Sequence, residues 1–520
     1  MASTIHSKSS AACSESPRSL SYSDAVSVSS ASSPPVNSSC SLSSSIQKTA
    51  IQKTTRQQQA GLASSESSAR QGLASLADLR INGDRLMSTL AEVGSIGGLP
   101  NGGVRRLAFS PEDCQARDRL SDWMKAAGMS VRIDTAGNLI GRYPGRYAEA
   151  AAIATGSHLD TVPNAGIYDG TYGVLAGLEV VRTLYDNSIQ LDHPLEVIVF
   201  ADEERTMIGS KAMTGRASLD PAQYAHPHYE PIESSLSNIG GSWAQLPQAV
   251  CRPGELAAFV ELHVEQGPVL EAVGNPIGLV TGIVGQRRYI ITVEGQASHA
   301  GTTPMPMRQD ALVAASQIVL AVNRIGCMKE GERLDPRSVI SNGMHGAIHN
   351  ATLTGDQVAT VGAMKLSPNV ANTIPGQIEM TLDIRDLSND CLDRMLALLE
   401  EDIEEIAITT QTRIQLKPQL KNEPVLVNSH IFNTIAQSCK QLGLKSHALP
   451  SRASHDAQII ADITDMGMIF VPSQAGISHA ETEYTHPAHC IQGTDVLLHT
   501  LLQLDQHYRC VETEQEAQNN

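Results

Sequence analysis

The chain has 520 residues, which is enough for two domains and a large core. Charged residues make up 18% and hydrophobic residues 41% of the chain, as in an ordinary soluble enzyme. The net charge of −17 argues against nucleic acid as a partner, and no apolar run approaches the roughly 20 residues that cross a bilayer. The nine cysteines are scattered and never spaced as CxxC, which favours a reducing compartment and argues against a thiolate zinc site. We therefore expect a cytoplasmic protein whose metal ions, if it binds any, are held by His and carboxylate side chains.

The two ends of the chain differ from the rest. Serine accounts for 20 of the first 50 residues, and such a segment cannot bury enough apolar surface to offset its ordering entropy. We predict a disordered tail over 1–75 and a second one over 510–520. A Ser-rich, acid-poor N-terminus also fits an organelle transit peptide, although arginine is scarce here.

Helices and strands alternate from residue 76 onwards. Asn82 is a polar cap for the first helix, and Ser110-Pro-Glu-Asp opens a second one, with Asp113 at the capping-box position. Strands are expected at 129–134, 138–142 and 195–200. This alternation predicts an α/β fold with a large mixed, mainly parallel sheet flanked by helices.

The stretch from Thr155 to Gly170 lies between a short apolar run, read as a buried strand, and a segment with helical apolar spacing. It places His158, Asp160 and Asp169 at the carboxyl end of a strand, where sites lie in parallel sheets. His158 and Asp160 are two residues apart, which suits a ligand imidazole oriented by a carboxylate. These residues predict a metal site; the alternative is a loop with ordinary polar residues.

Further candidate ligands follow other strands. Glu203 and Glu204 come after the strand 195–200, so one can bind metal while the other acts as a general base. A solvated charge pair is the alternative. His263 lies on an alternating strand at 258–266, where a lone His is more often simply packed. His479 follows a predicted strand at 468–471, and His455 is its rival.

A different pattern runs from 286 to 421. Strands and helices follow one another there as βαββαβ, which predicts a ferredoxin-like domain inserted into the larger one. The catalytic domain would then be discontinuous, over 76–285 and 422–509. Arg385 ends one of the inserted strands and suits a bidentate grip on a substrate carboxylate, although a surface ion pair is the commoner role.

The collected ligand candidates are three imidazoles and two carboxylates, a set that suits two divalent ions such as Zn²⁺ or Mn²⁺. Asp169 is best placed to bridge the ions, and Glu203 would take a proton from water and pass it to the leaving nitrogen. The chemistry that this set predicts is metal-assisted amide hydrolysis. Spacing alone does not select the five, which are His158, Asp169, Glu204, His263 and His479.

A series of motifs selects them. In chain order these are Gly156-Ser-His-Leu-Asp-Thr-Val, Tyr168-Asp-Gly, Asp202-Glu-Glu, Glu261-Leu-His-Val-Glu-Gln-Gly-Pro, Gly285-Gln-Arg-Arg, Ser298-His-Ala-Gly-Thr-Thr-Pro-Met, Asn372-Thr-Ile-Pro-Gly, Asp383-Ile-Arg, Ser454-His-Asp-Ala-Gln and Gly476-Ile-Ser-His. Together they resemble the M20 metallopeptidase-like amidohydrolases and, more narrowly, the hydantoinase/carbamoylase branch. The resemblance runs from about Leu76 to Tyr508.

The resemblance implies one ion on His158 and His263, another on Glu204 and His479, and Asp169 on both. It implies that Glu203 is the base and that Asp160 supports His158. It also implies a homodimer joined through a lid domain at 286–421, with His299 serving the partner's site. Substrate contacts are implied at Gln286, His299, Asn372 and Arg385.

The implied reaction is cleavage of the ureido (N-carbamoyl) C–N bond of a small carboxylate. Allantoate is the first choice, with release of ammonia and carbon dioxide. An N-carbamoyl-L-amino acid, a β-ureidopropionate or a ureidoglycolate is the alternative. Two departures from the family pattern stand out: Arg205-Thr-Met-Ile208 runs straight into Gly209, which shortens a loop beside the metal site, and 335–357 resembles an insertion. The shortened loop motivates a remote alternative, a catalytically silent metal-binding homologue.

Overall fold

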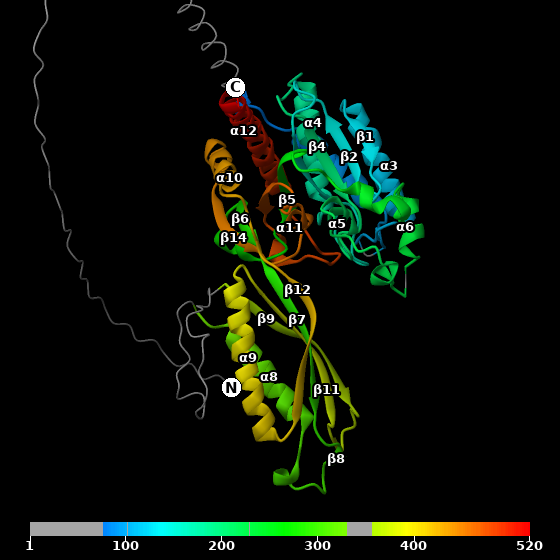
Figure 1. Ribbon diagram of the computed structural model, residues 1–520, viewed down its shortest axis with the longest axis vertical. Coiled ribbons are helices and arrows are strands. Elements are labelled where there is room, and N and C mark those ends of the chain that lie inside the picture. The colour runs from blue at the N-terminus through cyan, green and yellow to red at the C-terminus, as the bar shows by residue number, and fades with distance from the viewer. Residues whose placement is uncertain (1–75, 101, 228, 330–355, 520) are drawn as a thin grey trace, which may run out of the picture. The chain divides into compact units, whose positions relative to one another are not determined.

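The computed structural model describes residues 76–100, 102–227, 229–329 and 356–519. The Ser-rich segment 1–75 and most of the expected insertion at 335–357 lie outside these residues. Within them the chain forms two larger sheets, one of nine strands and one of four, and a short two-stranded ribbon (Figure 1).

The nine-stranded sheet has the order β1-β2-β4-β3-β5-β15-β6-β13, with β14 paired to β6. The four central strands β4, β3, β5 and β15 run parallel, whereas β1, β2 and β13 add antiparallel pairs at the edges. This is the mixed sheet with a parallel centre that the sequence predicted. The strands are β1 Ser130–Ile133, β2 Leu139–Tyr143, β3 Ala152–His158, β4 Leu195–Phe200, β5 Leu256–Val264, β6 Ile277–Ile283, β13 Val425–Leu426, β14 Ser446–Ser451 and β15 Asp465–Val471.

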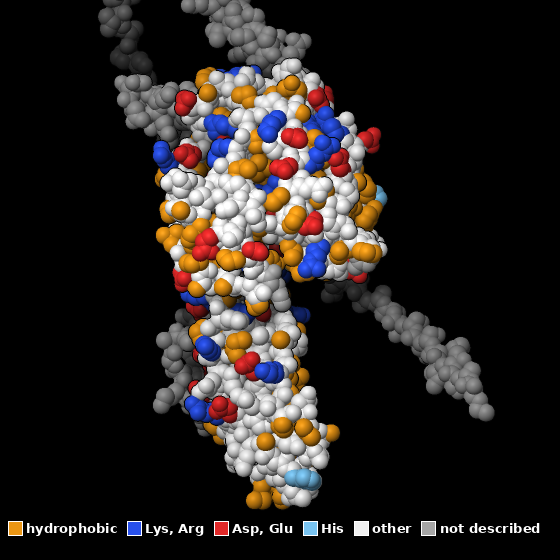
Figure 2. Space-filling view, turned by 90° about the vertical axis from the view of Figure 1, so that its right-hand side faces the viewer, with side chains coloured by type: hydrophobic (Ala, Val, Ile, Leu, Met, Phe, Trp, Pro, Cys, Tyr) orange, Lys and Arg blue, Asp and Glu red, His pale blue; other side chains and the backbone are white. Residues whose placement is uncertain are grey.

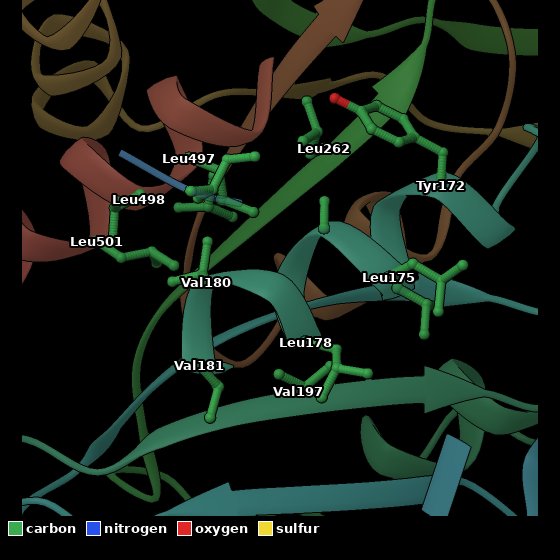
Figure 3. Close-up of a cluster of buried hydrophobic side chains, with 14 of the residues drawn as sticks. Tyr172, Leu175, Leu178, Val180, Val181, Val197, Leu262, Leu497, Leu498 and Leu501 are labelled. Atoms are coloured by element: carbon green, nitrogen blue, oxygen red, sulfur yellow. The ribbon is translucent and has the colours of Figure 1, made fainter. Parts of the chain in front are cut away.

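Every residue of β3 and β4 is buried, because cores cover both faces of the sheet. Ile153 packs into one core, while its neighbours Ala152 and Ala154 pack into another. The first core contains the helix α4 (Thr171–Asp186) and part of the helix α12 (Pro487–Asn519). Figure 3 shows leucine and valine side chains of α4 meeting those of β4, β5 and α12. The end of β3 and the start of α4 are thus fixed by dense packing.

The two predicted caps are present. Asn82 accepts a hydrogen bond from Arg85 N at the start of α2 (Gly83–Ser95), and Ser110 accepts one from Asp113 N at the start of α3 (Pro111–Ala126). Asp113 does not return to Ser110, however; its carboxylate accepts from Phe109 N and from Arg117. The remaining helices of this part are α5 Ile208–Met213, α6 Ile232–Asn238, α7 Val269–Val273, α10 Ser429–Gln441 and α11 Asp456–Ile460.

The four-stranded sheet is antiparallel and has the order β12-β7-β11-β9. Its burial alternates along β11, since α8 and α9 cover one face and leave the other more open. The chain order β7-α8-β9-β11-α9-β12 is the βαββαβ pattern expected from the sequence. The elements are β7 Gly285–Glu294, α8 Ala311–Gly326, β9 Val358–Ser367, β11 Gln377–Asp386, α9 Asn389–Thr410 and β12 Arg413–Asn422; β8 Ser298–His299 and β10 Thr373–Ile374 form the ribbon.

Some elements were not foreseen. We did not predict β6, β13 or β14, and α12 begins before the expected residue 494 and continues to Asn519, through most of the segment expected as a tail. On the face shown in Figure 2, acidic and basic side chains are interspersed. Among the described helices, none is long and apolar enough to cross a membrane.

Candidate active site

A cavity of about 210 Å³ lies where the carboxyl ends of β3, β4 and β5 meet the loop that follows β15. All five predicted metal ligands and the predicted base line it, although they come from widely separated parts of the chain. The lining residues are His158, Asp169, Glu203, Glu204, Met207, His263, Gln266, Arg385, Ala453, Ser454, His455 and His479.

His158, Asp169 and His263 form the first potential metal-binding group, and all three are buried. Asp169 Oδ1 lies 3.1 Å from His263 Nε2 and 3.7 Å from His158 Nε2. Each histidine directs Nδ1 towards a backbone carbonyl: His158 to Asp160 O at 2.9 Å and His263 to Val264 O at 2.8 Å. A carbonyl can only accept, so Nδ1 carries a proton in each ring, and Nε2, on the side of Asp169, is the nitrogen that can bind a metal ion.

Asp169, Glu204 and His479 form the second group, which shares Asp169 with the first. His479 Nε2 lies 3.2 Å from Asp169 Oδ2 and 3.5 Å from Glu204 Oε2. The side chain of His479 is 49% exposed, in contrast to the first group. Glu204 Oε1 is buried without a hydrogen-bond partner among the described residues.

Asp169 therefore stands between the two groups, with one carboxylate oxygen towards each. Gln266 Nε2 donates to Asp169 Oδ2 at 2.8 Å, and Ser478 Oγ donates to the same oxygen at 2.9 Å. Gly170 follows with φ 62°, and a Cβ there would lie 2.4 Å from the His158 ring. Only glycine allows both this backbone and this close approach.

Several residues at this site hold a left-handed backbone without being glycine. These are Met207 and His479, which line the cavity with φ 54° and 55°, Gln266 with φ 57°, and Asp202 with φ 57° just before the glutamate pair. Such conformations are costly and concentrate where geometry serves function.

Asp160 supports the site differently from our expectation. Its carbonyl oxygen, not its carboxylate, makes the hydrogen bond to His158 Nδ1; the nearest carboxylate oxygen is 3.8 Å away. The carboxylate instead accepts from the backbone N–H groups of Glu203, at 3.4 Å, and Glu204, at 3.2 Å. Asp160 thus anchors the glutamate pair.

Glu203 Oε2 lies 3.5 Å from His158 Nε2, at the wall of the cavity. Burial, reinforced by Asp456 and Glu204, raises the pKa of Glu203 well above its usual value. Burial and the neighbouring Asp169 also raise the pKa of Glu204 to about 8. Two crowded, desolvated carboxylates with raised pKa values are typical of catalytic sites and of sites that bind cations.

Asp169 raises the pKa values of two neighbouring histidines, His263 and His479. Its hydrogen bond raises the pKa of His479 to about 9. Burial lowers the pKa of His263, but the Asp169 carboxylate outweighs burial and brings it to about 9. Burial lowers the pKa of His158. Burial would raise the pKa of Asp169 itself, but His263 and His479 hold it well below its usual range.

The donor set fits divalent metal ions. It consists of imidazole Nε2 atoms, two of them on rings whose Nδ1 faces a carbonyl, a carboxylate with one oxygen towards each group, and a buried glutamate oxygen that has no hydrogen-bond partner in the described part of the chain. A third group, Glu261, His263 and His455, fits less well. The Glu261 oxygens already accept from Ser157 Oγ at 2.7 Å and Ala457 N at 3.0 Å, and His263 is directed towards Asp169.

The predicted substrate contacts form two pairs. Gln286 and Arg385 face each other across β7 and β11, and both bind Asp383, with Arg385 Nε 2.8 Å from Asp383 Oδ1. Arg385 lines the cavity and also donates to the carbonyl of Arg452 at 2.6 Å. His299 and Asn372 lie together at the β8–β10 ribbon, where Ala300 N donates to Asn372 O. Neither is among the residues that line the cavity.

Sequence reasoning did not single out Gln266 and Ser478, which hold Asp169, or Met207, which lines the cavity from the shortened loop. Gln266 and Ser478 stand inside the recognised motifs, next to proposed ligands, and that proximity was the available signal. His455, the rival of His479, lines the cavity with its ring 4.6 Å from that of His263. Its Nε2 is bound to Ser451 Oγ at 2.9 Å.

Comparison with known proteins agrees with this site. Residues 154–503 match the model of peptidase family M20/M25/M40, so the chain belongs to that family of hydrolases, and it is an amidohydrolase of the family's carbamoylase/allantoate group. N-carbamoyl-L-amino acid amidohydrolase of Geobacillus stearothermophilus is 38% identical, with 82% of this chain and 99% of the relative covered. Allantoate amidohydrolase of Escherichia coli is 34% identical, with 80% and 96% covered. A crystal structure of an amidase of the hydantoinase/carbamoylase family from Burkholderia multivorans has a TM-score of 0.72 at 36% identity, with 82% and 98% covered.

Proposed function

We propose that the protein is a binuclear, metal-dependent amidohydrolase that cleaves the ureido C–N bond of a small carboxylate. The observation that carries this proposal is the position of Asp169. One of its oxygens faces His158 and His263, and the other faces His479, which in turn lies beside Glu204. A carboxylate shared in this way suits a pair of ions.

His158 and His263 would hold one ion, Glu204 and His479 the other, and Asp169 both. Bound Zn²⁺ or Mn²⁺ would supply Lewis acidity towards the ureido carbonyl and lower the pKa of water in the cavity.

The protein's own residues then have distinct tasks. Glu203, with its raised pKa, is suited to accept a proton from water and to return it to the leaving nitrogen. Asp160 holds the backbone of Glu203 and Glu204 through both N–H groups. Arg385, the cationic side chain at the cavity wall, is placed to bind a carboxylate.

Allantoate is our first candidate substrate, because Gly285-Gln-Arg-Arg-Tyr and Ser454-His-Asp-Ala-Gln resemble allantoate-cleaving members. The likeness to N-carbamoyl-L-amino acid amidohydrolase makes N-carbamoyl-L-amino acids the second candidate. The test is ammonia release from a panel of ureido acids with added Mn²⁺ or Zn²⁺. Inactivity towards every member would reject the substrate class, and the preferred member identifies the substrate.

The shortened loop supports one rival, a silent metal-binding homologue. In this loop Met207 takes a left-handed backbone and reaches the cavity wall within three residues of Glu204. The complete ligand set and the base argue against the rival. Metal analysis together with the ammonia assay separates the two, since the rival binds metal without turnover.

We also propose that the chain forms a homodimer through the part that contains the four-stranded sheet. Leu320 on α8 and Ile408 on α9 support this, because they are 69% and 78% exposed. Light scattering of the wild type and of a Leu320→Glu/Ile408→Glu variant tests it. Wild-type dimers that become monomers are expected, and a monomeric wild type would reject the proposal.

A further inference from the structure

Three proposed ligands, Asp169, Glu204 and His479, lie on loops rather than on helices or strands. Asp160 holds the loop of Glu204. His158 and His263 are held by β3 and β5, but the loops of Asp169 and His479 need other contacts that fix their position relative to each other. Ser478, beside His479, touches Asp169 although 309 residues separate them in the chain.

A buried carboxylate that the proposed chemistry does not use joins these loops. Glu483 Oε1 accepts from two successive backbone N–H groups, those of Tyr168 at 2.9 Å and Asp169 at 3.0 Å. Its Oε2 lies 3.2 Å from Ser478 Oγ. The residue is 5% exposed, so these contacts are shielded from water.

The surrounding chain makes room for this carboxylate. A Cβ at Gly166 would lie 2.5 Å from Glu483 Cβ and 2.9 Å from its Oε1, so a larger residue there would displace Glu483. The hydroxyl of Ser478 has one proton and lies within reach of both Asp169 Oδ2 and Glu483 Oε2. The carboxylates of Asp169 and Glu483 are therefore linked through the loop that carries His479.

We propose that Glu483 is a positioning residue that fixes the backbone of Asp169 against the loop of Ser478 and His479 through hydrogen bonds. The inference rests on the proposed metal-dependent function. Glu483 does not itself face the first ligand group; it acts through the peptide of Asp169 and through Ser478.

Two variants distinguish hydrogen bonding from charge. Glu483→Gln keeps the length of the side chain and a carbonyl oxygen that can accept from both N–H groups, but it removes the charge. Glu483→Asp keeps the charge but is one methylene shorter, so it cannot span from Tyr168 N to Ser478 Oγ. If position matters, Gln preserves the site and Asp does not; if charge matters, the order reverses.

Glu481 supplies a matched control. It stands on the same loop, and its carboxylate accepts from Asn164 Nδ2 on the loop that carries Asp169, but it is exposed and its described contact is with Asn164 rather than with Asp169. Glu481→Ala therefore removes a link between the two loops without touching the backbone of a proposed ligand.

The experiment is titration of the metal-free full-length protein with Mn²⁺ against a chelating indicator. Glu483→Asp and Glu483→Ala are expected to bind about 10–100-fold more weakly, as is usual when a group that orients a ligand is lost. Glu483→Gln and Glu481→Ala are expected to stay close to wild type. Circular dichroism of the metal-free proteins checks folding, and if Glu483→Ala does not fold, the Asp and Gln pair decides.

Several results would overturn the inference. Wild-type affinity in Glu483→Asp, or equal losses in Glu483→Gln and Glu483→Asp, would show that hydrogen-bonded positioning is not the role of this residue. A wild-type protein that binds neither Mn²⁺ nor Zn²⁺ would instead reject the proposed function on which the inference rests.

Discussion

The structure brings the predicted metal ligands together but leaves the predicted substrate contacts in two separate places. The five ligands come from widely separated stretches of the chain and surround one cavity. The four substrate contacts form two separate pairs, Gln286 with Arg385 and His299 with Asn372, and Arg385 is the member that lines the cavity.

The difference has a physical cause. Strands β3, β4 and β5 are neighbouring parallel strands of the mixed sheet, so polar residues at their carboxyl ends are brought to one place. The substrate contacts belong to another sheet and to the ribbon beside it. Two of them are hydrogen-bonded within the protein, since Asp383 accepts from Gln286, Arg288 and Arg385. Sheet topology thus explains why the predicted ligands meet, whereas the predicted substrate contacts lie apart and are already engaged with other groups of the protein.

The largest effect is expected for Glu203→Gln, which tests the proposed base beside the predicted metal ligands. The amide keeps the size of the side chain but cannot accept the proton, so turnover should fall by about 10²–10⁴-fold. Both ions should still bind, because Glu203 is not among the proposed ligands. Metal analysis and ammonia release measure the two effects, and unchanged turnover would exclude Glu203 as the base.

A second test compares the buried and the exposed ligand group. Both His263→Ala and His479→Ala should weaken metal binding by more than the roughly 10–100-fold that loss of an orienting partner costs. His263→Ala should affect the ion at the buried group and His479→Ala the ion at the half-exposed group. Titration with Mn²⁺ separates them by stoichiometry, and the loss of both ions in each variant would show that the two groups form a single site.

Arg385→Lys tests the predicted substrate contacts. Lysine keeps the positive charge but loses the forked geometry, so kcat/KM for the ureido acid should fall by about 10–100-fold, the equivalent of one charged hydrogen bond. Metal binding should not change. Arg413→Lys, on the exposed strand β12, is the control. Unaltered kcat/KM would show that Arg385 does not bind the substrate.

The smallest expected effect concerns Asp383 and pH. Burial would raise the pKa of Asp383, but hydrogen bonds from Arg385, Arg288 and Gln286 outweigh burial and hold it below its usual value. The folded pKa is therefore lower than the unfolded one, so the stabilisation is complete above the unfolded pKa of about 3.9 and is lost as pH falls through the folded pKa.

Asp383→Asn should accordingly lower the free energy of unfolding at pH 7 by about 1 kcal/mol. The gap between variant and wild type should narrow below about pH 4. Urea unfolding at a series of pH values measures it. A gap that widens towards acid would contradict the assigned pKa direction.

Much of the fold could be predicted from the sequence, because local signals were strong. Asn82 and Ser110 cap their helices as expected, and the buried run 195–200 coincides with β4. Strands β13 and β14 were missed together with β6, since they pair with β6 and that strand was itself not predicted. The capping-box partner of Asp113 was also wrong, because Phe109 N lies in reach of its carboxylate.

For the site, the sequence by itself determined which side chains could bind metal: imidazoles and carboxylates placed just after buried strands, in motifs shared with a family. Only the tertiary structure decided their partners. It assigned the Asp160 carboxylate to the backbone of Glu203 and Glu204, engaged Arg385 with Asp383, and placed Glu483 behind Asp169. The reason is that residue type and spacing record what a group can bind, whereas the partner that it does bind is set by long-range packing.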